Sequence, residues 1–300
     1  MAKKSESLDD LRRRIDAIDD ALHDLLIERA EIGRRIGTVK GAARNGAAAW
    51  RPGREAQILR RLARRHRGPL PKAALVRIWR ELMTAFLRLQ GEFSVAVRAG
   101  ADDGTCREVA RDHFGGLTAI RSHETSMQVL REVGEGRAAI GVLPLPQQDD
   151  AQPWWPMLLA SDADLPRVIA RLPFVPGSLT GSEQEALVVG RVPLEKSGAD
   201  RSLIAIELGE EVSRAALRRQ CEAADLDATL LHHGHMPDEG RWLHLLDVDG
   251  FIEVDDARIA MLRKGLGKRA LHVLVALGGY AAPLTMEELG LASAETEAAQ

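Results

Sequence analysis

One cation interrupts an otherwise apolar helical pattern near the start of the chain. Apolar side chains recur in steps of three and four, at Leu8, Leu11, Ile15, Ile18, Leu22, Leu25, Ile32, Ile36 and Val39. The step of four after Leu25 falls on Arg29. A guanidinium that is buried without a partner is costly, so Arg29 should meet an anion. That anion is either a structural carboxylate or a ligand, unless the side chain extends to solvent at the edge of the core.

Two further cations lie on the same predicted helix. Lys40 follows Arg29 by 11 residues, which is about 16 Å along a helix, so both side chains can converge on one ligand about 10 Å across. Arg12 precedes Arg29 by 17 residues, about 25 Å along a straight helix. A site shared by all three cations would therefore need Arg12 from a second chain.

The helix that positions these cations is long. Ser7 and Asp10 form a capping-box-like start, and the 3.5-residue period continues to Val39. The predicted helix covers about 33 residues and about 50 Å. A second helix is predicted to begin after Pro52 and to stop near Gly68, and a third to begin after Pro71. Three helices of such unequal length cannot bury their apolar faces alone, so the pattern favours an intertwined helical dimer.

The second helix opens with the run Arg51-Pro52-Gly53-Arg54-Glu55. Arg54 and Glu55 directly precede apolar residues, which makes them candidates for a polar site. Glu55 in the first turn would also offset the helix dipole, which is an ordinary structural role. A solvent-exposed basic face is predicted for Arg60, Arg61, Arg64, Arg65 and Arg67.

Three segments together resemble the all-helical class of chorismate mutase over about residues 7–92. They are LDDLRRRIDAIDDALHDLLIERAEIGRRIGTVK, RPGREAQIL and the helix ending LRLQ. The resemblance implies an intertwined homodimer with two sites and no cofactor or metal. It also implies conversion of chorismate to prephenate in aromatic amino acid biosynthesis. This rearrangement needs no nucleophile, and preorganised cations would hold the reactive conformer and stabilise charge on the ether oxygen.

The resemblance also implies the roles of individual residues. Arg29, Lys40 and Gln90 are the expected catalytic residues, with Lys40 and Gln90 beside the ether bond that breaks. The expected substrate-binding residues are Arg12 of the neighbouring subunit, Arg29, Arg54 and Glu55, the last for the ring hydroxyl. Two positions depart from the family pattern: Arg51 stands where many members have an acidic residue, and Phe86 where a small hydroxyl residue is common.

The remainder of the chain predicts two further domains and a tail. Residues 93–197 alternate short strands and helices, which is an α/β pattern. Residues 198–283 follow the βαββαβ order of a ferredoxin-like unit, and residues 284–300 form an acidic tail. The predicted fold class is therefore multidomain, α plus α/β. The order resembles that of the bifunctional chorismate mutase–prephenate dehydratase, whose last part is a regulatory ACT domain that could bind an allosteric effector.

The middle domain resembles the dehydratase only in part. The family's Pro-Ile-Glu-Asn-Ser motif is replaced by Pro144-Leu145-Pro146-Gln147-Gln148, and its Thr-Arg-Phe motif by Gln184-Glu185-Ala186. We therefore predict a degenerate, reduced domain without dehydratase activity. The usual effector motifs of the ACT family are also missing from the last domain, although Gly278-Gly279-Tyr280 resembles the family's closing Gly-Ser-Tyr. His232-His233-Gly234-His235 could bind a metal, but we favour an ordinary strand end.

Composition limits the class of protein and the partners. The two cysteines are far apart and no apolar run is long enough to span a membrane, which favours a cytoplasmic protein. Residues 1–92 hold 21 Lys and Arg against 12 Asp and Glu, whereas the other residues hold 20 against 32. The basic part predicts an anionic partner. A nucleic acid would leave Arg29 unexplained, while an isochorismate pyruvate-lyase on the same fold and a non-catalytic regulator stay as alternatives.

Overall fold

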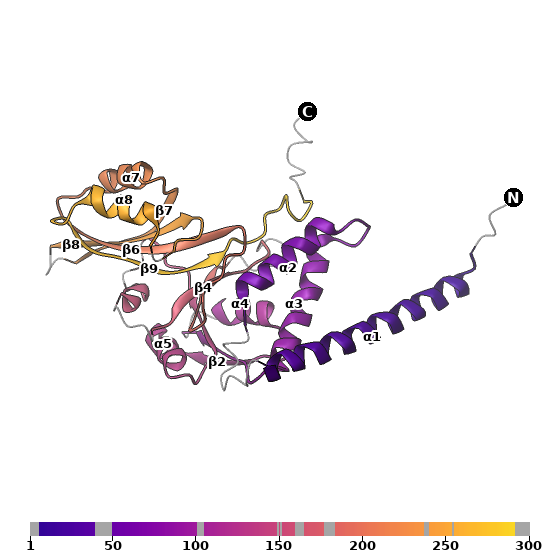
Figure 1. The fold of residues 1–300 in the computed structure, drawn as a ribbon. Coiled ribbons are helices and arrows are strands. Elements are labelled where there is room, and N and C mark those ends of the chain that lie inside the picture. The colour runs from indigo at the N-terminus through magenta and orange to yellow at the C-terminus, as the bar shows by residue number, and fades with distance from the viewer. Residues whose placement is uncertain are drawn as a thin grey trace, which may run out of the picture.

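The computed structural model consists of a helical N-terminal part followed by one mixed sheet with helices on its faces (Figure 1). It describes residues 6–39, 50–100, 105–148, 150, 152–159, 165–176, 184–236, 240–253 and 255–291. The helices are α1 (Leu8–Val39), α2 (Pro52–Arg65), α3 (Lys72–Arg88), α4 (Thr105–Phe114), α5 (Ser126–Gly134), α7 (Arg214–Ala223) and α8 (Ala257–Leu266), with the 3-10 turn η2 (Trp155–Leu158). The strands are β1 (Ser94–Arg98), β2 (Ala119–His123), β3 (Ile140–Pro144), β4 (Arg167–Leu172), β5 (Ala186–Gly190), β6 (Asp200–Gly209), β7 (Ala228–Met236), β8 (Arg241–Asp249) and β9 (Leu271–Ala281).

Helix α1 starts where the sequence predicts. Ser7 and Asp10 form the capping box, because the Asp10 backbone N–H donates to Ser7 Oγ at 3.1 Å and the Ser7 N–H donates to Asp10 Oδ2 at 3.2 Å. The helix extends away from the rest of the molecule (Figure 1). Its apolar positions, here named the α1 stripe, are between 41% and 63% exposed: Leu8, Leu11, Ile15, Ile18, Leu22, Leu25, Ile32 and Ile36. The side chain of Val39 lies outside the described residues.

Helices α2 and α3 pack against each other and against the sheet. Ala56, Leu59 and Ala63 of α2 share a core cluster with Phe174 and with Leu284, which follows β9. The face of α3 that is buried carries Val76, Arg80, Thr84 and Leu87. Another face of α3 is partly uncovered, since the apolar residues Ile78 and Leu89 are exposed.

The prediction of an exposed basic face on α2 is wrong for Arg60. This side chain is 4% exposed, donates to the carbonyl oxygen of Ala282, and pairs with Glu288 at 3.4 Å. Its position follows from the docking of α2 on the segment after β9, which periodicity within α2 cannot reveal. The first residues of the predicted tail are therefore packed, and Leu284 and Leu289 are buried; residues 292–300 lie outside the described part.

The sheet is continuous from the middle region to the C-terminal region. Its strand order is β2-β1-β3-β5-β4-β9-β6-β8-β7. The elements β6 to β9 follow the predicted βαββαβ order, and their four strands are antiparallel neighbours. The two regions on either side of residue 197 share this sheet, because β4 pairs in parallel with β9 through Val168 and Gly278; the predicted domain boundaries stay a prediction.

Gly278 makes the junction between the two regions possible. Its φ is +138°, and a Cβ atom at this position would collide with the backbone of Val168. Apolar side chains fill both faces of the sheet: the clusters beside α4 and under α7 and α8 lie on one face, and a cluster that includes Val129 of α5 and Trp155 lies on the other. The helical part is thus attached to one wide sheet that both regions share.

Candidate active site

The predicted site residues Arg29 and Gln90 each contact Phe86, near the place where α1 meets the end of α3. The Arg29 guanidinium carbon lies 4.2 Å from the centre of the Phe86 ring. Gln90 follows α3, and its Nε2 donates to the Phe86 carbonyl oxygen at 3.4 Å. Gly37 of α1 lies beside Gln90, since a Cβ atom on Gly37 would be 3.4 Å from Gln90 Cα.

Arg29 is exposed to solvent, although neighbouring groups partly desolvate its guanidinium. Burial lowers the pKa of its guanidinium, which nevertheless stays charged at neutral pH. In the described part of the chain, Arg29 has no ion pair and no hydrogen bond to a carboxylate. A Cβ atom on Gly33, one turn further along α1, would meet nothing within 4 Å. In the single chain the guanidinium is therefore unneutralised and open to solvent, so it is accessible to an anionic ligand.

Three other predicted site residues do not join Arg29 within the described chain. Lys40 lies outside the described residues. Arg12 is at the opposite end of α1, is exposed, and pairs with Asp9 at 3.3 Å. Arg54 is also exposed, and it donates to Gln57 on its own helix at 3.2 Å. The roles of these three residues stay predictions.

Glu55 makes its polar contacts away from Arg29. The Trp50 indole donates from Nε1 to Glu55 Oε2 at 3.0 Å, and Trp50 belongs to the core shared by α3, α4 and the sheet. Burial raises the pKa of the Glu55 carboxyl, although the nearby charge of Arg80 acts in the opposite direction. A role for Glu55 in binding a ring hydroxyl stays a prediction, and one of its carboxylate oxygens already has a partner.

The unusual Arg51 and the buried Arg80 have structural partners. Arg51 Nε donates to Glu195 at 2.6 Å, which ties the start of α2 to the loop before β6. Arg80 is 4% exposed, and it donates to the Asp112 carbonyl oxygen at 3.2 Å. Burial lowers the pKa of the Arg80 guanidinium. The burial of Arg80 was not predicted from the sequence, although its spacing of four residues from both Val76 and Thr84 was the available signal.

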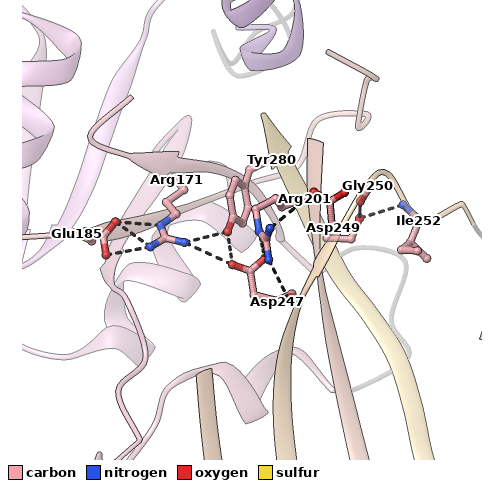
Figure 2. A network of polar contacts seen from close by, with 9 residues as sticks. Arg171, Glu185, Arg201, Asp247, Asp249, Gly250, Ile252 and Tyr280 are labelled. Atoms are coloured by element: carbon pink, nitrogen blue, oxygen red, sulfur yellow. Dashed lines mark hydrogen bonds and ion pairs between the residues drawn. The ribbon is translucent and has the colours of Figure 1, made fainter. Parts of the chain in front are cut away.

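A second cluster of charged side chains lies where the two regions of the sheet meet (Figure 2). Asp247 on β8 accepts from the Tyr280 hydroxyl at 2.7 Å and from Arg201 Nε at 2.9 Å. Arg171 on β4 lies 3.4 Å from the same carboxylate and forms a bidentate pair with Glu185 at 2.8 and 2.9 Å. Every charge in the cluster is thus matched inside it, which fits a structural junction better than a catalytic site.

The segments that replace the dehydratase motifs carry neutral or paired side chains. Gln147 and Gln148 follow β3 and are exposed, and Gln148 donates to the Leu230 carbonyl oxygen at 3.3 Å. Gln184 is exposed before β5, and the adjacent Glu185 is held by Arg171. Neither segment offers a free acid at the corresponding positions.

The histidines of the predicted strand end lie inside β7. His232 is buried against Trp155, and His233 stacks on Trp242. His235 pairs with Glu210 at 2.7 Å. Among the described residues, no group of three or more His, Cys, Asp or Glu side chains has an arrangement suited to a metal ion.

Comparison with known proteins identifies the helical part. Residues 11–91 match the family model described as chorismate mutase type II. The N-terminal part of this chain thus resembles a chorismate mutase domain. The matched residues include Arg29 and Gln90. The match confirms the resemblance that the sequence alone suggested. Among the described helices, none is long and apolar enough to cross a membrane.

Curated relatives extend the similarity beyond the mutase domain. The bifunctional chorismate mutase/prephenate dehydratase of Stutzerimonas stutzeri is 32% identical over 145 residues, 47% of this chain and 40% of the relative. The protein with the same description from Aquifex aeolicus is 34% identical over 144 residues, 47% of this chain and 39% of the relative. The match thus spans about two fifths of the relatives' length. A structure of prephenate dehydratase from Streptococcus mutans has 13% identity and a TM-score of 0.45, over 64% of this chain and 98% of the other.

Proposed function

We propose that this protein is a chorismate mutase that rearranges chorismate to prephenate in aromatic amino acid biosynthesis. The observation that carries the proposal is the unneutralised guanidinium of Arg29, which lies against the Phe86 ring of α3 within the residues that match chorismate mutase type II. Chorismate is a dicarboxylate, so a preformed cation without a protein carboxylate suits it. The relatives that share 31–34% identity with this chain carry the same activity in their descriptions.

In this proposal, the residues act by position and charge rather than by proton transfer. Arg29 binds a substrate carboxylate and holds the chair-like conformer, and Arg54 assists it. Lys40 and Gln90 donate to the ether oxygen as its bond breaks and its charge grows. Removing one preorganised donor of this kind costs about 2.7–4 kcal/mol at the transition state, which is roughly a 100- to 1,000-fold loss of kcat.

We further propose that two chains intertwine through α1 and that each lends Arg12 to the other's site. The exposed α1 stripe supports this arrangement, because a contiguous apolar row of this length marks an interaction surface. The distance along α1 also supports it, since Arg12 and Arg29 of one chain are about 25 Å apart. Equimolar mixing of Arg12→Ala and Arg29→Ala chains should then restore activity, because one site of each heterodimer keeps both arginines. If exchange of subunits restores nothing, Arg12 does not act across the dimer.

The middle region is proposed to have no prephenate dehydratase activity. Loss of the ring hydroxyl and carbon dioxide requires a positioned acid. Support comes from the exposed glutamines at positions 147, 148 and 184 and from the pairing of Glu185 with Arg171. Prephenate incubated with the purified chain at neutral pH should give no more phenylpyruvate than buffer alone. The C-terminal βαββαβ unit is proposed to be ACT-like, and addition of single amino acids to the mutase assay tests for an effector.

The decisive experiment measures the disappearance of chorismate and identifies the product. Wild-type chain should give prephenate, whereas free pyruvate would indicate a lyase instead. Arg29→Ala and Lys40→Ala should each lose at least 100-fold in kcat while the circular dichroism spectrum is unchanged. Arg13→Ala is the matched control, because Arg13 is an exposed cation of α1 that pairs with Asp10. Wild-type turnover in the Arg29 variant would contradict the site.

A further inference from the structure

Phe86 supplies the contact that holds Arg29 in place. The guanidinium carbon lies 4.2 Å from the ring centre, and the ring itself is half-buried at the end of α3. Other arginines of α1 are held differently: Arg12 pairs with Asp9, and Arg14 pairs with Glu6. Arg29 has no acidic residue one turn before or after it, because those positions are Leu25, Leu26, Ile32 and Gly33.

An aromatic ring positions a guanidinium without using its donors. Contact with the ring face involves the π electrons, so the N–H groups at the edge of the guanidinium keep their capacity for hydrogen bonds. A carboxylate partner would instead occupy two of those donors and neutralise the charge. Beside Arg29 the space over Gly33 is open, so a ligand carboxylate can approach the free edge.

We propose that Phe86 is the positioning residue for Arg29, and that its ring orients the guanidinium toward a carboxylate of the substrate. This inference rests on the proposed mutase function and adds a residue to its site. It accounts for a bulky aromatic side chain next to the site, and it links Phe86 to Gln90, whose side-chain amide donates to the Phe86 carbonyl oxygen. A leucine at this position would fill similar space but would provide no attractive face for the cation.

The proposal is tested by changing the electron density of the ring and little else. Phenylalanine at position 86 is replaced in the full chain by mono-, di- and trifluorophenylalanine, which weaken a cation–π contact in steps. We expect KM for chorismate to rise stepwise along the series. Phe86→Leu should lower kcat/KM by roughly 2- to 30-fold, in line with the strength of such contacts, and Phe86→Tyr should keep wild-type values. Arg88→Ala, an exposed residue of the same helix, is the control.

The stability of each variant separates positioning from folding. Equal thermal midpoints across the fluorinated series, together with a graded KM, support the proposal. A flat KM along the series with an active wild-type chain would overturn it. So would a Phe86→Leu variant whose activity falls only in proportion to a lower thermal midpoint.

A signal that does not require turnover distinguishes this proposal from the mutase proposal. The side-chain NMR resonances of Arg29 should carry a ring-current shift that disappears in Phe86→Leu. If the shift is present and the wild-type chain leaves chorismate unchanged, the proposed function fails and the positioning role fails with it. If the wild-type chain is active and the shift is absent, the mutase proposal stands and the role of Phe86 is refuted.

Discussion

Replacing Leu22 by lysine tests whether the α1 stripe is a dimer interface. Leu22 is near the middle of α1 and is 52% exposed. In the single chain, a lysine at this position would simply extend into solvent, so folding should be unaffected. In an intertwined dimer, the same lysine would lie at the seam between two long helices.

The expected effect on the dimer is large. Full burial of a leucine contributes about 1.5–3 kcal/mol, so covering the exposed half of Leu22 contributes about 1 kcal/mol in each chain. The variant loses this contribution and also places an ammonium group in an apolar seam, where it has no partner. Two-fold symmetry applies the change twice. We therefore expect a loss of at least about 4 kcal/mol, which makes dissociation about a thousandfold easier.

Sedimentation equilibrium over a range of protein concentrations measures this effect. Wild-type chain should be dimeric, and Leu22→Lys should be monomeric at micromolar concentration and inactive toward chorismate. Asp20→Lys is the matched control, because residue 20 lies about 200° around the helix from residue 22 and adds the same side chain to the opposite face. A Leu22→Lys chain that dimerises as tightly as wild type would refute the assignment of the stripe.

Three further changes test the junctions of the fold. Tyr280→Phe removes the hydroxyl that donates to Asp247, so the free energy of unfolding measured in urea should fall by about 1–3 kcal/mol; an unchanged midpoint would show that the network adds nothing. Burial lowers the pKa of His244 to about 4, so its contribution to stability is present above pH 6.5 and is lost as the pH falls. His244→Leu should therefore gain about 2–3 kcal/mol relative to wild type between pH 7 and pH 4, and a constant difference would contradict this. Burial raises the pKa of Glu55, so the pH dependence of stability is reversed: stability is lost as the pH rises through that pKa. The Glu55→Gln side chain can still accept from Trp50. This variant should be more stable relative to wild type at pH 7 than at pH 4, as urea titrations at the two values would show.

Local periodicity predicted the elements of this chain well. The helix around the α1 stripe, the alternating strands after residue 93 and the βαββαβ order after residue 198 all occur in the structure. Each signal lies within one element, since a seam or an alternation is visible over 5 to 30 residues. The capping box at Ser7 belongs to the same class, because both partners are three residues apart.

Contacts between distant segments were not predictable in the same way. Arg60 was placed on a solvated face, but its partners Ala282 and Glu288 are more than 200 residues away. The pairing of β4 with β9 depends on a glycine that admits the Val168 backbone, and no alternation of side chains signals it. For the site, the sequence singled out Arg29 as a cation in an apolar seam. It did not reveal that the departure at Phe86 lies directly against that cation.

The docking of α2 connects the candidate site to the rest of the chain. This helix carries Arg54 on its exposed side and Glu55 at the boundary with the sheet, where Trp50 and Arg80 meet the carboxyl. Arg60, one and a half turns later, is fixed by the segment after β9. Arg60 and Arg80 are buried between the helical part and the rest of the molecule. Separating the two parts would leave these charges without partners, at a substantial cost in free energy. The sheet and the segment after β9 therefore fix the position of α2, the helix that carries the predicted site residues Arg54 and Glu55.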